Sequence, residues 1–326
     1  MSVRNVGIIG IGSYTPPKVV TNSDLEKMVD TSDEWIVTRT GIKERRIAEP
    51  DVATSDLSFE AAKIALASAN LSPKDIDLII VATVTPDMLF PATACVLQDK
   101  LGAECPGFDL SAGCSGLIYA LSVGTQFVAN GTYNNVLVVG AEVLSKITDW
   151  QDRSTCVLFG DGASAMILAP VERGGFRSFV LGADGSGGKL LELPAGGSRL
   201  PTSYDTVSQR LHYIKMNGRE VFKFAVKIMG EAALDAIEKA GLTPSDIDLF
   251  IPHQANIRII ESAAERLKLS MDKVFINLDK YGNTSSASIG IALHEALLSG
   301  KIREGSRIVM VGFGAGLTWG ACVLEW

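Results

Sequence analysis

Apolar residues recur along the chain with the spacings of helices and of buried strands, and the same order of elements occurs twice. Segment 71–80 (LSPKDIDLII) reappears as 242–251 (LTPSDIDLFI), with seven of ten residues identical at an offset of 171. Each copy follows a stretch with helical apolar spacing and then enters an apolar strand. The helical positions are Phe59, Ala62, Leu66 and Ala69 before the first copy, and Val226, Met229, Ala233 and Ile237 before the second.

The repeat continues further along the chain. Segment 136–140 (VLVVG) matches 308–312 (IVMVG) at an offset of 172, and each follows an apolar helix predicted over about 117–129 or 288–299. Alternating helices and buried strands are typical of an α/β fold. We therefore predict two βα halves, each with a mostly parallel sheet covered by helices.

The division between the halves is placed at residues 1–171 and 172–326. The stretch between the repeats, roughly 142–215, contains glycine- and serine-rich turns, and we expect it to be an elaboration that lines a site. If the halves pack about a pseudo-twofold axis, loops at equivalent strand ends meet near that axis, where open α/β sheets bind ligands.

Composition and charge exclude several classes of protein. The chain has 326 residues, 47% of them hydrophobic, and its net charge of −7 argues against nucleic-acid binding. The charge-free run 110–141 has the length of a membrane helix, but polar residues interrupt it, so we interpret it as a buried helix and strand. The N-terminus lacks a signal peptide, and five cysteines without a CxxC pattern suit reduced thiols. These features predict a cytoplasmic protein without a metal site.

Cys114 is the candidate nucleophile. It lies in 111–116 (SAGCSG) at the predicted start of a buried helix, and the offset of 172 relates it to Ser286. A helix N-terminus stabilises a thiolate, so we expect a lowered pKa and an activated sulfur. The alternative is a small buried cysteine that only fills space in the core.

His253 is the candidate imidazole, because it follows a predicted buried strand in 250–256 (FIPHQAN). A structural histidine is the alternative interpretation. The glycine-rich segment 311–320 (VGFGAGLTWG) permits backbone conformations that direct N–H groups toward an oxyanion, although a tight hairpin explains it equally well.

Together, Cys114, His253 and Asn283 in these contexts resemble the 3-oxoacyl-[acyl-carrier-protein] synthase III family of the thiolase superfamily. The resemblance runs from end to end and includes 31–41 (TSDEWIVTRTG), 159–163 (FGDGA) and the terminal GLTWG. It implies a duplicated thiolase-like fold, in which two five-stranded sheets form a five-layered αβαβα arrangement.

The resemblance also implies the reaction. Acyl-CoA acylates Cys114, and the oxyanion is held by the backbone N–H groups of Cys114 and Ala315. His253 and Asn283 then stabilise the enolate formed when malonyl-acyl carrier protein loses CO2, and the enolate attacks the acyl group. No cofactor and no metal are required, because acyl-CoA is a substrate.

Binding residues are implied in the same way, together with a homodimer and an acyl carrier protein as partners. Phe90 is expected to reach the acyl pocket from the partner subunit. The residues are Trp35, Arg39, Thr40, Arg153, Gly218, Phe222, Ala255 and Asn256 for CoA, Phe90 and Phe313 for the acyl pocket, and Arg258, Lys223, Lys227, Arg266 and Lys268 for the carrier protein.

Other readings of the sequence are weaker. A thiolase needs a second C-terminal cysteine, which 314–316 (GAG) lacks, and elongating condensing enzymes have a second histidine where this chain has Asn283. A secondary-metabolism acyltransferase of the same fold, which moves the acyl group from cysteine to oxygen or nitrogen, remains an alternative. A non-catalytic acyl-CoA-binding protein is the alternative from a different class.

Overall fold

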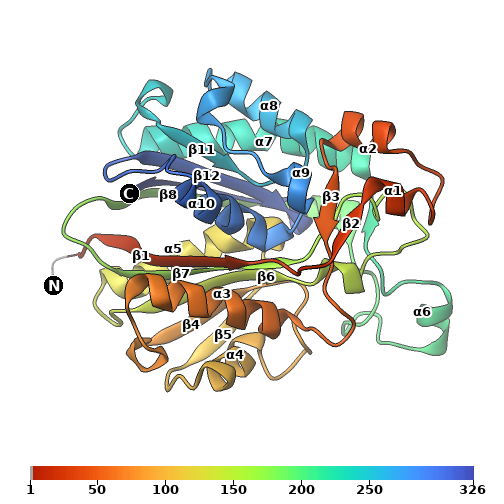
Figure 1. Cartoon of the computed structure of the whole chain (residues 1–326), viewed down its shortest axis with the longest axis horizontal. Helices are drawn as coiled ribbons and strands as arrows, with labels where there is room; N and C mark the ends of the chain where they lie inside the picture. The colour runs from red at the N-terminus through yellow and green to blue at the C-terminus, as the bar shows by residue number, and fades with distance from the viewer. Residues whose placement is uncertain (1–2) are drawn as a thin grey trace.

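The computed structural model describes residues 3–326, and its two sheets alternate with three layers of helices (Figure 1). The first sheet has the strand order β1-β7-β6-β4-β5 and the second has the order β11-β12-β13-β8. The strands of the first sheet are β1 (Val6–Tyr14), β4 (Leu78–Ala82), β5 (Gly107–Leu110), β6 (Val136–Glu142) and β7 (Gly162–Pro170). Those of the second are β8 (Gly175–Ala183), β11 (Leu249–Pro252), β12 (Arg307–Gly314) and β13 (Thr318–Glu325).

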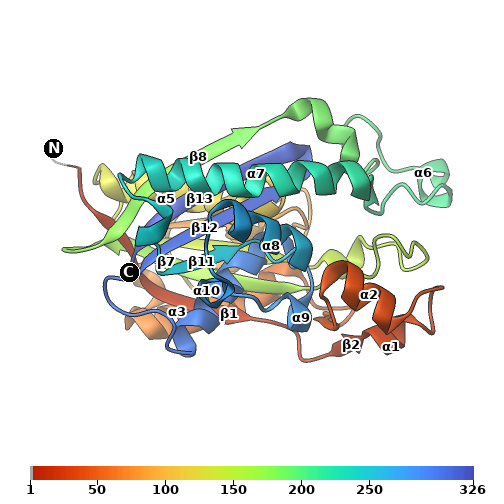
Figure 2. The same cartoon turned by 90° about the horizontal axis from the view of Figure 1, so that it is seen from above.

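Two helices lie in each layer. One pair covers the outer face of the first sheet, a second pair lies between the sheets, and a third covers the second sheet (Figure 1). Seen from above, the third pair lies over the strands of the second sheet (Figure 2). In that order, the pairs are α3 (Thr54–Ala69) and α4 (Thr93–Leu101), α5 (Gly116–Ala129) and α10 (Ser288–Leu298), and α7 (Gly218–Lys239) and α8 (Ile257–Arg266). The expected five-layered α/β arrangement is confirmed.

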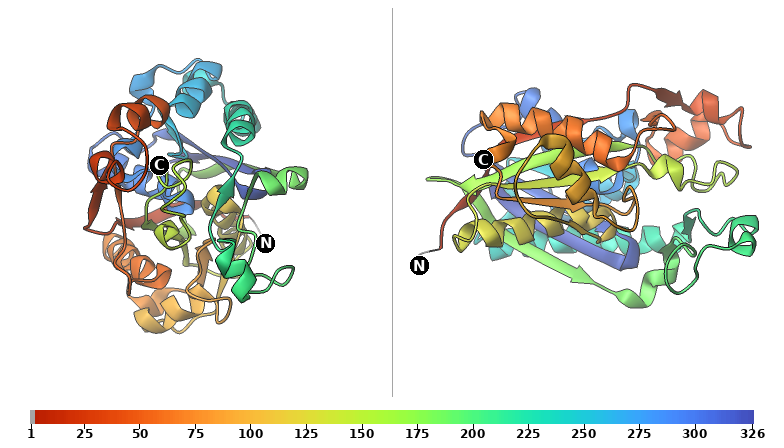
Figure 3. Two further views of the ribbon diagram at one scale, coloured as in Figure 1. Left: turned by 90° about the vertical axis from the view of Figure 1, so that its right-hand side faces the viewer. Right: turned by 90° about the horizontal axis from the view of Figure 1, so that it is seen from below.

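Smaller elements gather at one end of the molecule, where α6 projects outward (Figure 3). They are β2 (Val19–Thr21), α1 (Asn22–Leu25), α2 (Asp33–Thr40), β3 (Glu44–Arg46), β9 (Leu191–Glu192), α6 (Tyr204–Ser208), β10 (Lys215–Met216) and α9 (Leu278–Tyr281). No helix within residues 3–326 combines the length and apolar character that a membrane crossing requires.

The sequence repeat is also a repeat of strand register. In the first sheet Leu78 pairs with Val136 in parallel, and at the repeat offsets Leu249 pairs with Ile308 in the same way. Each sheet also contains one strand that runs antiparallel to its neighbours, β7 in the first sheet and β13 in the second, so both sheets are mixed. The repeated sequence segments therefore form the same strand pairing in both sheets.

The second sheet has four strands rather than the expected five. In the first sheet β5 pairs in parallel with β4, beginning at Ile79. At the equivalent place, Phe250 makes a single parallel bridge with Val274, so the fifth strand is reduced to one pair of residues.

The stretch between the repeats contributes strands as well as turns. It supplies β7 to the first sheet and β8 to the second. Every strand of the first sheet precedes residue 171 and every strand of the second follows residue 172, while the division into two halves at that point stays a prediction.

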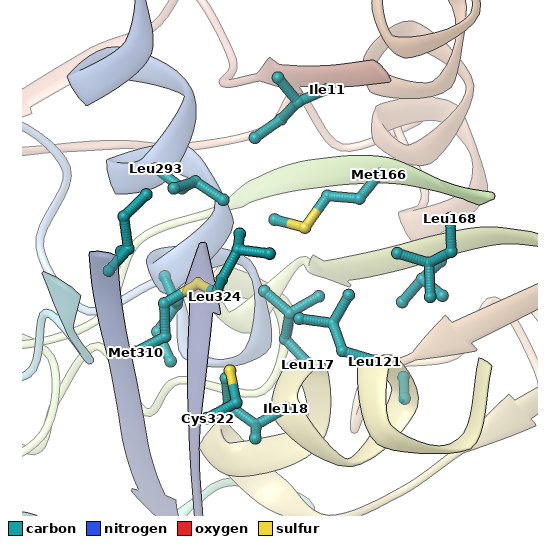
Figure 4. Close-up of a cluster of buried hydrophobic side chains, with 14 of the residues drawn as sticks. Ile11, Leu117, Ile118, Leu121, Met166, Leu168, Leu293, Met310, Cys322 and Leu324 are labelled. Carbon is teal, nitrogen blue, oxygen red and sulfur yellow. The ribbon is translucent and has the colours of Figure 1, made fainter. Parts of the chain in front are cut away.

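The main core lies between the sheets, around α5 and α10 (Figure 4). Leu117 and Leu121 of α5 and Leu293 of α10 are fully buried there, between Met166 of the first sheet and Met310 of the second. Both predicted apolar helices are therefore central helices, and their N-terminal turns meet deep inside the protein.

Gly140 makes a close contact between the first sheet and the turn that precedes α10. A Cβ atom on Gly140 would lie 2.4 Å from the carbonyl oxygen of Ser286, which is backbone and cannot rotate away. We therefore expect Gly140→Ala to lower the free energy of unfolding by about 1–3 kcal/mol, as overpacking does. Urea denaturation measures this, with Gly188→Ala as the control, because nothing lies within 4 Å of a Cβ there. Equal stability of the two variants would contradict the packing argument.

Candidate active site

Cys114 lies in the 3-10 turn Gly113–Ser115 directly before α5, as predicted. Gly113 has a φ of 55°, and a Cβ there would lie 2.6 Å from the backbone nitrogen of Ala315. A Cβ on Gly314 would lie 2.3 Å from the backbone nitrogen of Cys114. Only glycines permit this approach, which brings the backbone N–H groups of Cys114 and Ala315 close together.

Ala315 fits its loop without strain. The residues with positive φ in the turn are Gly316, at 76°, and Leu317, at 45°. Alanine at position 315 therefore keeps an ordinary backbone conformation, and its N–H remains where the glycine-rich loop meets Cys114.

His253 follows β11 and presents a hydrogen-bond donor. Its Nδ1 lies 2.6 Å from the Ser288 hydroxyl, which also accepts the N–H of Gln254 at 3.4 Å, and we assign the hydroxyl as the donor to Nδ1 of the neutral ring. This arrangement assigns the ring proton to Nε2. Burial lowers the pKa of His253 to about 3, so the imidazole is neutral near pH 7.

Asn283 presents a second donor. Its Oδ1 accepts the N–H of Ser285 at 2.8 Å, which leaves the Nδ2 amide group for a ligand. Its backbone N–H donates to the carbonyl of Leu158, and its own carbonyl accepts the N–H of Gly160. The first half of the chain therefore holds the asparagine of the second half in place.

The thiol differs from our expectation. Burial raises the pKa of Cys114 to about 12, and the nearby carboxyl of Glu142 acts in the same direction. A hydrogen bond with Ser285 opposes the shift. The predicted lowering by the helix N-terminus is wrong for this structure, because desolvation of the sulfur outweighs it. The resting cysteine is a neutral thiol.

Two pockets meet at Cys114. The first has a cavity volume of about 100 Å³ and is bounded by Cys114, His253, Asn283 and Phe313. The second has a cavity volume of about 190 Å³, is mainly aliphatic and has Cys114 and Ala315 in its wall. Phe159 and Leu191 line both. The aliphatic side chains of the second pocket are Val84, Leu144, Ile147, Leu193 and Ile214.

The expected CoA residues fall into two groups. Gly218, Phe222, Ala255 and Asn256 line the first pocket. Trp35, Arg39 and Arg153 form a separate cluster, with the guanidinium carbon of Arg153 5.3 Å from the Trp35 ring centre and that of Arg39 at 6.0 Å. Thr40 is buried, and its hydroxyl donates to the Ile36 carbonyl and accepts the Ile42 N–H, so the structure does not bring it to either group.

The two expected acyl-pocket residues lie elsewhere in the single chain. Phe313 lines the first pocket, where its ring packs edge-on against His253 at 5.6 Å. Phe90 is 85% exposed and lines neither of the two pockets at Cys114.

The expected basic residues are also divided. Arg258 lies over the Phe222 ring at 5.2 Å, beside the first pocket. Lys223 pairs with Glu220 on α7. Arg266 pairs with Glu231 and, with Lys268, borders a separate hollow. Lys227 is on α7, one turn beyond Lys223.

Sequence reasoning missed the residues that orient the site. Ser285 and Ser288 are serines in a small-residue segment, and Glu142 ends a strand, so no spacing signal separates them from ordinary residues. The lining residues Leu191 and Ile214 come from the stretch between the repeats, which we expected to line a site. Within residues 3–326, no group of three or more metal-ligating side chains is present.

Known proteins resemble this chain along its whole length. The family model 3-oxoacyl-[acyl-carrier-protein (ACP)] synthase III matches residues 108–185, and its C-terminal counterpart matches 237–326. A beta-ketoacyl-[acyl-carrier-protein] synthase III of Caldanaerobacter subterraneus subsp. tengcongensis is 63% identical, over 98% of this chain and 97% of the relative. A relative with the same name in Desulfitobacterium hafniense is 57% identical, over 99% and 98%. The crystal structure of a synthase III from Thermus thermophilus is 55% identical, with a TM-score of 0.93 over 98% of this chain and 99% of that one.

Neutral His253 makes stability depend on pH. The unfolded chain binds a proton at this residue below about pH 6.5, whereas the folded chain does not until about pH 3. The stability from this site is therefore complete above pH 6.5 and is lost as the pH falls toward 3. Between pH 7.5 and 5.5, we expect wild type to lose about 1 kcal/mol more than His253→Asn does in urea denaturation. Equal losses would show that the folded imidazole titrates normally.

Proposed function

The chain belongs to the 3-oxoacyl-[acyl-carrier-protein] synthase III family, and we propose that it uses Cys114, His253 and Asn283 for the reaction of that family. This reaction condenses an acyl-CoA with malonyl-acyl carrier protein and starts fatty-acid synthesis. The observation that carries the assignment of roles is that one pocket is bounded by a thiol and two hydrogen-bond donors. It requires no resident cofactor.

In the first step, Sγ of Cys114 attacks the thioester carbonyl of acyl-CoA. The carbonyl oxygen becomes an oxyanion, which the backbone N–H groups of Cys114 and Ala315 stabilise. The intermediate then expels CoA and leaves an acyl-Cys114 thioester. Donors placed where charge develops are worth roughly 3–4 kcal/mol each.

In the second step, malonyl-acyl carrier protein enters the first pocket. Nε2–H of His253 and Nδ2–H of Asn283 donate to its thioester oxygen, where charge develops as CO2 leaves. The enolate carbon attacks the acyl-Cys114 carbonyl, a carbon–carbon bond forms, and the carbon–sulfur bond breaks. A neutral imidazole suits this role, because it can donate Nε2–H while Nδ1 accepts from Ser288.

In this proposal, bound CoA extends from the cluster of Trp35 and Arg153 into the first pocket. Gly218, Phe222 and Asn256 line the pantetheine path, and the adenine stacks between Trp35 and Arg153. The 5.3 Å between these last two is less than the roughly 7 Å that two stacking contacts need, so Arg153 moves away from Asp30, to whose carbonyl it donates at 2.8 Å.

Two surfaces fit the expected macromolecular partners. Met88, Leu89 and Phe90 form an exposed apolar loop near β5, the edge strand of the first sheet, and we assign this face to a second copy of the chain. In a dimer, Phe90 would bound the partner's acyl pocket. Arg258 lies beside the pocket, so it is the basic residue best placed to receive an acidic carrier protein.

The two half-reactions separate the roles of the three residues. With radiolabelled acetyl-CoA, we expect label on Cys114 in wild type, His253→Ala and Asn283→Ala, and none in Cys114→Ser. Decarboxylation of malonyl-acyl carrier protein should fall about 10²–10³-fold in His253→Ala and in Asn283→Ala, since each removes one donor. Label that persists undiminished in Cys114→Ser would overturn the assignment of the nucleophile.

The second pocket is the proposed place of the primer's acyl chain. Ile214 is buried in its wall, so Ile214→Phe should shorten it. We expect kcat/KM for butyryl-CoA to fall at least tenfold relative to acetyl-CoA, since one methylene in such a pocket is worth about 1–3 kcal/mol. Phe224→Leu, a change outside this wall, is the control. An unchanged ratio in Ile214→Phe would place the acyl chain elsewhere.

Arg258 and Arg266 form a matched pair for carrier-protein binding. We expect Arg258→Ala to raise KM for malonyl-acyl carrier protein about five- to tenfold, because a charge beside the pocket is lost. Arg266→Ala should change it less than twofold, since that guanidinium pairs with Glu231. Steady-state kinetics at low ionic strength measure both. Equal effects would mean that the carrier protein covers the whole of α8.

A further inference from the structure

The proposed mechanism leaves one proton without an acceptor. Cys114 is a neutral thiol, and its S–H proton has to leave as the sulfur attacks. His253 carries its ring proton on Nε2 and accepts from Ser288 at Nδ1, and Asn283 offers Nδ2 donors. Neither residue can take the proton in this arrangement.

Glu142 is a fully buried carboxyl that this mechanism does not use. It ends β6, and hydroxyls surround it: Thr85 Oγ1 lies 2.7 Å and Thr83 Oγ1 3.2 Å from Oε2. On its other side, the hydroxyls of Ser285 and Ser286 lie 3.1 Å and 2.9 Å from Oε1. Within residues 3–326 no lysine or arginine forms an ion pair with it.

Ser285 connects this carboxyl to the thiol. Its hydroxyl donates to Glu142, its turn packs against the turn that carries Cys114, and it shares the wall of the second pocket with Cys114. Its φ is 48°, a conformation that non-glycine residues rarely adopt and that the surrounding structure has to impose. The Asn283 side chain helps to impose it by accepting the Ser285 N–H.

We propose that Glu142 accepts the thiol proton of Cys114 through the Ser285 hydroxyl during acylation; the inference rests on the proposed function. The S–H proton passes to Oγ of Ser285, and the proton of Oγ passes to Oε1 of Glu142. The sulfur electron pair forms the bond to the acyl carbon. When the intermediate collapses, the proton returns by the same route to the departing CoA sulfur, and Glu142 is a carboxylate again.

Burial suits Glu142 to this role. Desolvation raises the pKa of Glu142, which makes its carboxylate a better base, while hydrogen bonds from Thr85, Ser286 and Ser285 oppose the shift. The charge of the Glu142 carboxylate raises the pKa of Cys114, and the other titratable side chain of the site, His253, is neutral. The transfer moves a proton within the pocket without changing the number of charges there.

Two serines provide a matched pair for the test. Ser285 and Ser286 both donate to Oε1 of Glu142, but the Ser286 hydroxyl also lies 2.9 Å from the carbonyl of Ala82, and of the two only Ser285 shares a pocket wall with Cys114. We expect single-turnover transfer of label from acetyl-CoA to slow about 10²-fold in Glu142→Gln and at least tenfold in Ser285→Ala. Ser286→Ala leaves the route from Cys114 to Glu142 in place and should slow the transfer less than Ser285→Ala does. The acidic limb of the pH–rate profile should be lost in Glu142→Gln.

Decarboxylation distinguishes proton transfer from general damage. In a Cys114→Ala background, Glu142→Gln should decarboxylate malonyl-acyl carrier protein within threefold of the background rate. The proposal fails if Glu142→Gln acylates at the wild-type rate, if Ser285→Ala and Ser286→Ala are equally slow, or if acylation and decarboxylation fall together. If Glu142→Gln does not fold, the serine pair decides alone. Absence of label in wild type would instead overturn the proposed function.

Discussion

The site depends on one packing constraint, which is the approach of two helix-opening turns to the opposite sheet strands at the centre of the molecule. Gly140 of the first sheet lies against the backbone of Ser286, and Gly312 of the second sheet lies 3.3 Å, at its Cβ position, from the carbonyl oxygen of Cys114. The repeat offset of 172 relates both pairs. A Cβ at Gly140 would collide with backbone and one at Gly312 would be tightly packed, so the two glycines permit the close approach of the turns that carry the reactive groups.

Desolvation follows from that packing and determines the charge states. It raises the pKa of Cys114 and of Glu142 and lowers that of His253. The thiol and imidazole are therefore neutral, and the groups offered to substrate are hydrogen-bond donors. Donors in a water-poor pocket stabilise a developing oxyanion more strongly than they would in water. They are already oriented toward the oxyanion, and little solvent is present to screen the interaction. Because the same desolvation keeps the thiol protonated and excludes water, the thiol proton needs an acceptor within the pocket.

The features that the sequence predicted correctly are the repeated segments and the positions of two candidate site residues. A ten-residue duplication predicted the shared strand register, and Cys114 and His253 stood out at the ends of predicted elements. The reduced fifth strand at Val274 was not predictable, because strand pairing there depends on contacts far apart in the chain. The shift in the pKa of Cys114 was predicted in the wrong direction. The prediction considered only the helix N-terminus next to Cys114 and not the burial of the sulfur by residues far away in the sequence. Ser285 was missed because its role depends on Glu142 and Cys114 together.

Divergence of the two halves explains how one plan yields different chemistry. Gly113 and Ser285 occupy equivalent positions and share a left-handed backbone, with φ of 55° and 48°. Glycine in the first turn admits the backbone of Ala315, whereas serine in the second places a hydroxyl against a carboxyl. The strand ends differ in the matching way, since Glu142 corresponds to Gly314, which packs on the Cys114 nitrogen. Each half thus contributes one glycine, Gly113 or Gly314, to the close approach of the Cys114 and Ala315 N–H groups, and one polar residue, Glu142 or Ser285, to the proposed proton route beside the sulfur. Equivalent positions in a duplicated fold can take different roles in this way, because each residue packs against a different part of the other half and the two need not be the same residue.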